Sequence, residues 1–87
     1  MNNDQILFTF PCSYPVKIMG LNNAIFTAAV MSIFQRHVPD EQFICSSQLS
    51  KSNKYLSITV TFTAESKEQL DALYQELNDH ELVLMTL

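Results

Sequence analysis

The sequence predicts an α+β fold with the order strand, helix, strand, strand, helix, strand. Three observations predict it. Residues 54–64 alternate between apolar and polar side chains, apolar residues recur at helical spacing over 26–37, and a helix-capping sequence stands at 66–69. Side chains of a strand point alternately to its two faces, whereas those of a helix repeat about every 3.6 residues. These patterns therefore distinguish strand from helix along most of the chain.

The first strand is expected over residues 14–19, and Gly20 is expected to end it. Asn22 or Asn23 can accept a hydrogen bond from a free amide of the first helical turn, and so cap the helix that follows. This helix is predicted to end at His37, because a proline stands two residues later.

The middle of the chain is predicted to form a β-hairpin. Residues 43–49 alternate weakly and give the second strand, and the polar residues 50–53 connect it to the third strand at 54–64. The connection contains no glycine, which favours a loose loop over a tight two-residue turn.

A capping box begins the second helix. Ser66 is expected to cap the third helical amide while Gln69 reaches back. Apolar residues then recur at helical spacing from Leu70, a break is expected at Asn78, and residues 82–87 are predicted to form the last strand.

This order of elements is the split β-α-β pattern of ferredoxin-like folds. Right-handed crossovers place both helices on one face of a four-stranded antiparallel sheet. We expect a single domain over residues 10–87, preceded by a flexible lead-in over 1–9. One face of the sheet is then covered by helices, and the other face is open to solvent or a partner.

Alternation also predicts which side chains form the open face. They are Lys17 and Met19 on the first strand, Tyr55, Ser57, Thr59 and Thr61 on the third, and Leu82, Leu84 and Thr86 on the last. An open surface with apolar members suggests a ligand or partner site. Threonine is also a good strand former, so a half-solvated sheet with no partner explains part of this pattern. The binding hypothesis centres on Lys17, Met19, Tyr55, Thr59 and Leu84.

Charge and composition disfavour several classes of function. The 87 residues carry a net charge of −4, and the five basic residues are scattered, whereas nucleic-acid binding needs clustered lysine and arginine. No apolar run is long enough to span a membrane, and the polar start lacks the basic residues of a secretory signal. We expect a cytoplasmic protein that binds neither nucleic acid nor membrane, and whose Cys12 and Cys45 are free thiols.

The polar clusters give no catalytic motif. Arg36 and His37 close the first helix, where positive charge favours the helix dipole, although Arg36 with Lys17 could also form an anion site. Cys12 is expected in the lead-in and Cys45 to pack as a small hydrophobe, with no sequence signal that either stands beside a histidine. The cysteines and histidines lack the local pairing of structural zinc sites, and a single glycine rules out phosphate-binding loops. We therefore expect a non-enzyme without metal or cofactor.

Six segments in order resemble the YbeD-like family of small bacterial proteins. They are Phe10-Pro11, Val16–Gly20, Gln35–Pro39, Ser57–Val60, Leu73–Leu77 and Val83–Leu87. The resemblance covers residues 10–87 and implies a sheet similar to that of ACT regulatory domains, which often bind small metabolites and pair across a dimer. Members of the family are often labelled as lipoate-associated regulators, and the family offers no catalytic residues to carry over.

This chain departs from the family pattern in two places. The hairpin lacks the usual glycine and is one residue shorter, and residues 21–35 contain no ionisable side chain. Ile25, Ala28 and Ala29 are therefore expected to form an apolar outer strip on the first helix.

Three hypotheses follow. The first is a regulatory or ligand-sensing module of ACT-like type, linked through the resemblance to lipoate metabolism, which binds a small metabolite or a second copy through the open face. The alternative is a protein-interaction adaptor without a small ligand. The weakest is a thiol enzyme that uses Cys12 or Cys45.

Overall fold

A computed structural model describes residues 9–87 and shows one antiparallel sheet of four strands in the order β2-β3-β1-β4. The elements are β1 (Cys12–Leu21), α2 (Ala24–His37), the short 3-10 helix η1 (Pro39–Glu41), β2 (Phe43–Leu49), β3 (Tyr55–Ala64), α3 (Lys67–Asp79) and β4 (Val83–Thr86). This confirms the ferredoxin-like order that the sequence predicts. The lead-in was predicted over residues 1–9, and residues 1–8 of it lie outside the described residues.

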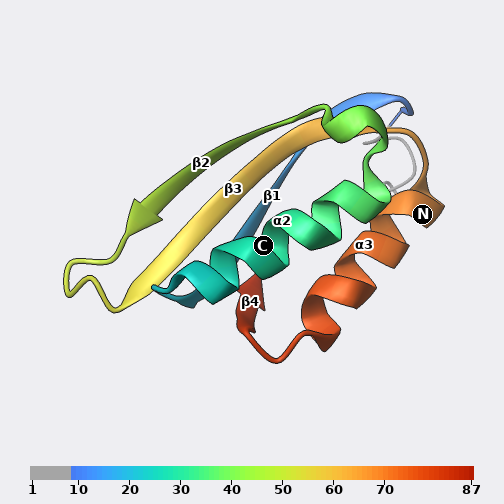
Figure 1. Ribbon diagram of the computed structural model, residues 1–87. Coiled ribbons are helices and arrows are strands. Elements are labelled where there is room, and N and C mark those ends of the chain that lie inside the picture. Colours follow the sequence, from blue (N-terminus) through green and yellow to red (C-terminus); the bar gives the residue numbers. More distant parts are fainter. Residues whose placement is uncertain (1–8) are drawn as a thin grey trace, which may run out of the picture.

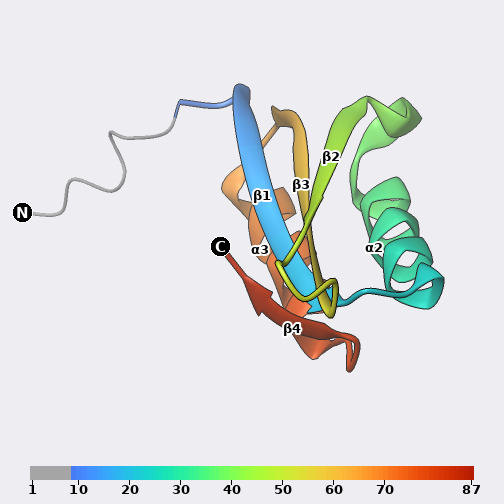
Figure 2. The ribbon, with the colours of Figure 1, turned by 90° about the vertical axis from the view of Figure 1, so that its left-hand side faces the viewer.

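Both helices lie on the same side of the sheet. Figure 1 shows α2 and α3 side by side in front of the strands, and the view from the hairpin side shows α2 to the right of them (Figure 2). The residues that face the helices form one core, and the largest fully buried members are Phe26, Phe34, Ile18, Ile33, Leu73, Leu77, Val16, Val30 and Val60. Neither helix is long and apolar enough to cross a membrane, among the residues described.

The strand β1 is longer than the sequence predicts at both ends. Cys12, expected in the lead-in, is its first residue and packs partly buried against the core. Gly20, expected to end the strand, lies inside it and is buried. A Cβ at Gly20 would stand 2.5 Å from two ring atoms of Phe26. The glycine therefore serves close packing of β1 against α2 and does not break the strand.

Side-chain caps begin both helices. Asn23 Oδ1 accepts from the backbone N–H of Phe26 at 2.7 Å, and Ser66 Oγ accepts from that of Gln69 at 3.1 Å. Gln69 Oε1 accepts from the N–H of Glu65 at 2.7 Å. The capping residues are thus those that the sequence predicts. Gln69 reaches back as expected, but to the residue before the cap, Glu65, and not to Ser66 itself. The second helix ends one residue after Asn78, with His80 as its C-cap.

The hairpin between β2 and β3 turns without glycine. Asn53 takes the left-handed backbone conformation, with φ of 60°, which asparagine tolerates better than most residues. The Ser50 N–H donates to the Tyr55 carbonyl at 3.0 Å and closes the loop. This explains how a connection without glycine reverses the chain.

Candidate functional site

Four of the five predicted site residues gather on the open face of the sheet. In the pairing of β1 with β3, Lys17 lies opposite Thr59, Met19 opposite Ser57, and Leu21 opposite Tyr55. These residues alternate with Val16, Ile18 and Ile58, which are buried under the helices. The sheet pleat therefore directs Lys17, Met19, Tyr55 and Thr59 away from the core, as the sequence predicts.

The predicted face of β4 is wrong for two residues. Thr86 lies opposite the buried Ile18, and its hydroxyl donates to Asn78 Oδ1 of α3 at 3.0 Å, so it belongs to the helix side. Leu82 precedes the strand and packs partly buried against the core. The pairing of β1 with β4 shifts by one residue between Met19 and Gly20. Leu84 is the extra residue at this shift, so it has no partner on β1, and its side chain is 58% exposed.

The sequence analysis missed two residues of the open face, Met85 on β4 and Leu87 directly after it. Met85 lies opposite Met19, and Leu87 exchanges two backbone hydrogen bonds with Lys17, at 2.8 and 3.2 Å. They are 50% and 66% exposed. Residues 82–87 are apolar at five of six positions, so no alternation was available to indicate which side faces the core.

We name the resulting apolar group the sheet patch, and its members are Met19, Leu21, Tyr55, Met85 and Leu87. It covers the end of the open face that is nearer the hairpin loop, with Lys17 at its inner border. An open depression of about 180 Å³ adjoins it, lined by Met19, Gln48, Leu49, Ser50, Tyr55 and Ser57. A larger open depression of about 420 Å³ lies at the other end, lined by Ser13, Gln42, Phe43, Ile44, Thr61, Phe62 and Thr63.

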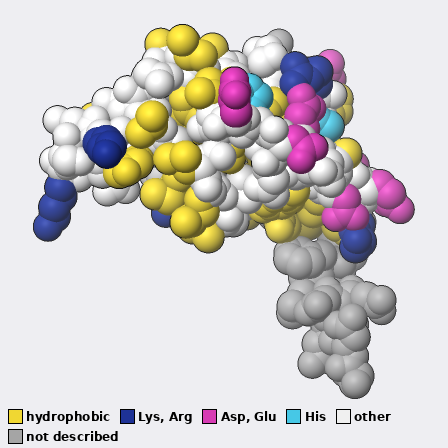
Figure 3. Space-filling model, turned by 90° about the horizontal axis from the view of Figure 1, so that it is seen from below, with side chains coloured by type: hydrophobic (Ala, Val, Ile, Leu, Met, Phe, Trp, Pro, Cys, Tyr) yellow, Lys and Arg dark blue, Asp and Glu magenta, His cyan; other side chains and the backbone are white. Residues whose placement is uncertain are grey.

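Charge is distributed unevenly between the two sides of the molecule. Arg36 and Lys67 are each bound to a carboxylate, Glu76 and Asp71 respectively. In the described part of the chain, no ion pair involves Lys17 on the open face or the hairpin lysines Lys51 and Lys54. The carboxylates are concentrated on α3 and its flanking loops. In Figure 3 the left-hand end shows basic groups without carboxylates, whereas the carboxylates toward the right lie next to further basic groups.

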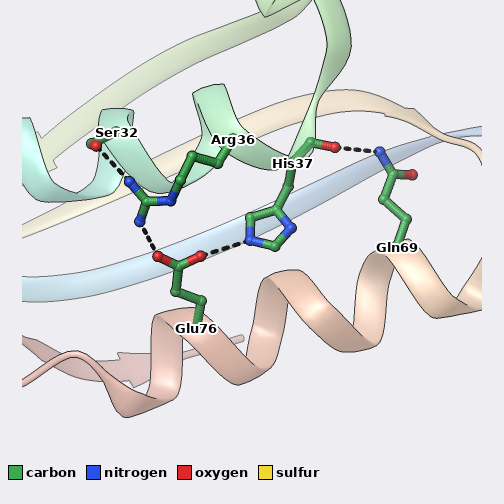
Figure 4. Close-up of polar contacts among 5 residues, drawn as sticks. All are labelled: Ser32, Arg36, His37, Gln69 and Glu76. Carbon is green, nitrogen blue, oxygen red and sulfur yellow. Dashed lines mark hydrogen bonds and ion pairs between the residues drawn. The ribbon is translucent and has the colours of Figure 1, made fainter.

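Arg36 is held by a cluster between the two helices, which overturns the predicted anion site with Lys17. Arg36 donates to Ser32 Oγ at 2.9 Å and pairs with Glu76 of α3 (Figure 4). Lys17 projects from the opposite face of the sheet, so the two cations cannot share an anion. The sequence explained Arg36 by the favourable interaction of a positive charge with the end of its helix. The structure adds an ion pair with Glu76, which is 40 positions away and which no local sequence pattern reveals.

His37 belongs to the same cluster. Its Nε2 lies 2.7 Å from Glu76 Oε1, and its backbone carbonyl accepts from Gln69 Nε2 at 2.8 Å. Burial, and to a smaller extent the neighbouring Arg36 guanidinium, lower the pKa of His37 below its ordinary value. The ring is therefore a hydrogen-bonded, partly buried link between α2 and α3.

The two thiols lie on different strands, Cys12 on β1 and Cys45 on β2, with β3 between them. Cys45, expected to pack as a small hydrophobe, is instead exposed on the edge strand β2, where its thiol contacts Met31 Sδ at 3.7 Å. Partial burial of its Sγ raises the pKa of Cys45, which lowers the fraction of reactive thiolate at neutral pH. Within residues 9–87, no group of three or more histidine, cysteine or carboxylate side chains is placed to hold a metal ion.

Comparison with known proteins agrees with the fold and with the resemblance found in the sequence. A UPF0250 protein from Nitrosomonas europaea is 41% identical over 85 residues, covering 97% of this chain and 98% of the relative. A UPF0250 protein from Neisseria gonorrhoeae is 40% identical over 87 residues, covering 98% and 94%. The solution structure of protein HP0495 from H. pylori superposes with a TM-score of 0.69 at 16% identity, covering 100% of this chain and 94% of that one. The profile of a family described as protein of unknown function (DUF493) matches residues 5–87, and the chain belongs to this family of small bacterial proteins.

Proposed function

We propose that this protein is a cytoplasmic adaptor that binds a protein segment through the open face of its sheet, and that the segment carries apolar and acidic side chains. The observation that carries the proposal is the sheet patch with Lys17 at its border. Exposed apolar side chains grouped on one face are typical of interaction sites. In the described strands, no carboxylate side chain projects from the open face, so Lys17 is available to pair with an acidic group.

The shape of the face favours a macromolecule over a small ligand. Small-molecule sites are concave and bury most of the ligand. Both depressions on this face are open to solvent on one side, and only the smaller one adjoins the sheet patch. An exposed apolar group with a polar or charged border, such as the sheet patch with Lys17 beside it, is the usual arrangement of a protein interface.

The charge separation argues for an acidic partner and against nucleic acid. An acidic segment approaching the open face meets Lys17 and the hairpin lysines, while the carboxylates of α3 lie on the far side. A phosphate backbone would need several clustered cations, and two of the five basic residues are already neutralised by carboxylates. Complementary charge of this kind mainly raises the association rate and the specificity.

A ligand-sensing function is the second candidate. The depression of about 420 Å³ has the size of a small-molecule site and offers the hydroxyls of Ser13, Thr61 and Thr63. A metabolite with a carboxylate and an apolar chain would suit these groups together with Lys17, and lipoate is the one that the family resemblance suggests. This alternative needs the depression to close around its ligand, because it is open in the free protein.

The test compares two charge reversals of equal size. The wild-type chain, Lys17→Glu and Lys67→Glu are immobilised and exposed to a bacterial lysate, and captured proteins are identified. We expect Lys17→Glu to lose the captured protein at least tenfold and Lys67→Glu, on α3, to retain it. Equal capture by Lys17→Glu and wild type would exclude the open face.

Backbone amide NMR then separates the two candidates. Titration with an acidic, apolar segment of the captured protein should shift signals of β1, β3 and β4 around the sheet patch. Saturable shifts around Ser13 and Thr63 with lipoate or another metabolite would instead support ligand sensing. Shifts confined to α2 and α3 contradict both candidates.

A further inference from the structure

Among residues 9–87, no strand pairs with the outer edge of β2. β2 lies at one end of the strand order, and Figure 1 shows it along the outer edge of the sheet. Its seven residues contain no charge and no proline, and its pairing with β3 runs without a bulge. Natural proteins usually protect such an edge with charge, proline, a bulge or a very short strand. The other edge strand, β4, is protected in this way, because it has four residues and a register shift.

The alternation of hydrogen bonds along β2 shows which of its backbone N–H and C=O groups are left unpaired at the outer edge. Ser50 donates to Tyr55, and N–H and C=O groups of an antiparallel strand point to alternate sides. Since Ser50 bonds to β3, every second residue before it does so too, which gives Gln48, Ser46 and Ile44. The backbone groups of Phe43, Cys45, Ser47 and Leu49 therefore point outward, away from the sheet.

We infer that β2 pairs antiparallel with β2 of a second copy of this chain, about a two-fold axis at Ser46. In this register Phe43 lies opposite the partner's Leu49, and Cys45 opposite the partner's Ser47. All four outward-pointing residues then pair with outward-pointing residues of the other copy. The two four-stranded sheets become one continuous sheet.

The charges that flank β2 favour a second copy over an unrelated strand. Asp40 stands exposed just before β2, and Lys51 and Lys54 stand exposed just after it. Antiparallel pairing brings the turn that carries Asp40 of one copy beside the hairpin loop with the partner's Lys51. The edge itself is uncharged, so the copies meet without like-charge repulsion.

The side chains beside the edge are compatible with such a contact. On the helix side, an open groove of about 140 Å³ lies between α2 and β2, lined by Thr27, Met31, Cys45, Ser46, Ser47, Leu56 and Ile58. None of these is charged. On the open face, Ile44 is 76% exposed and would come beside the partner's Gln48. A dimer formed in this way would carry two open faces, one from each copy. The inference does not depend on the proposed adaptor function.

The first test introduces a positive charge at Ser46, on the proposed two-fold axis, and measures the mass in solution. Light scattering over a dilution series should give twice the chain mass for the wild type at high concentration. Ser46→Lys sets two lysines against each other and should give the mass of a single chain, whereas Thr63→Lys, on β3, should behave as wild type. A single-chain mass for the wild type at every concentration, or an unchanged dimer in folded Ser46→Lys, would overturn the inference.

The second test measures proximity at the axis. Ser46→Cys in a Cys12→Ser, Cys45→Ser background places two thiols at a non-hydrogen-bonded pair, where the Cβ atoms are close enough for a disulfide. Under mild oxidation we expect a covalent dimer from Ser46→Cys and little from Thr63→Cys in the same background. Equal cross-linking of the two variants contradicts the β2 interface even if a dimer exists.

Discussion

The two faces of the sheet differ although the same strands supply both. On β1, Ile18 is fully buried under the helices, while its neighbour Lys17 is exposed. On β3, Val60 is buried and Thr59 is only half-buried. The helix-covered face is continuous and apolar, whereas the open face mixes threonine, lysine and the sheet patch. The comparison shows that one face of this small domain supplies its buried core, and that the other face stays open.

The largest expected effect separates two adjacent residues of β1. Ile18→Ala should lower the free energy of unfolding by about 2–5 kcal/mol, because it removes buried methyl groups and leaves a cavity. Lys17→Ala should change it by no more than about 0.5 kcal/mol. Urea denaturation measures both. A large loss in Lys17→Ala would show that the open face also contributes to folding.

Close packing of the covered face predicts the next effect. Gly20→Ala should cost about 1–3 kcal/mol, because the new methyl group overlaps the buried ring of Phe26. Combining it with Phe26→Leu should give less than the sum of the two losses, since the smaller side chain makes room for the methyl. Simple additivity in this double-mutant cycle would contradict the close approach of β1 and α2.

The cap of α3 predicts a smaller effect on the same face. Ser66→Ala removes the acceptor for the Gln69 amide and should cost about 1 kcal/mol. Ser66→Asn keeps an acceptor and should lose little. Thermal unfolding of both variants tests this, and equal losses would mean that the hydrogen bond contributes nothing.

The smallest expected effect is the pH dependence of stability that arises from His37, at the contact between α2 and α3. The pKa of His37 is lowered in the folded chain, so the unfolded chain binds the proton first as the pH falls. The contribution of neutral His37 to the free energy of unfolding is therefore fully present above pH 6.5. It is lost as the pH falls from 6.5 through the lower pKa of the folded chain. Denaturant midpoints between about pH 8 and pH 5 should fall less in His37→Gln than in the wild type. His80→Gln is the control, and a wild-type pH dependence in His37→Gln would contradict the assignment.

Most of the fold and part of the site could be predicted from the chain. Alternation over residues 54–64 and capping by Ser66 identified β3 and α3. The pleat placed Lys17, Met19, Tyr55 and Thr59 on one face. The last strand was predicted, but the open face assigned to Leu82 and Thr86 was wrong, because residues 82–87 are apolar at five of six positions and the strand contains a register shift. The anion site failed because the partner of Arg36 is Glu76, which is distant in sequence.

The sequence by itself determined the type and order of the elements, because period and capping are local properties of neighbouring residues. Only the tertiary structure decided what distant segments do to one another. It places Phe26 against Gly20 and joins Arg36 and His37 to Glu76. It also places Met85 opposite Met19, and Leu87 beside Lys17. It also leaves the uncharged edge of β2 without a partner strand among the described residues. Such contacts depend on the packing of helices and the register of strands, which no local window of residues specifies.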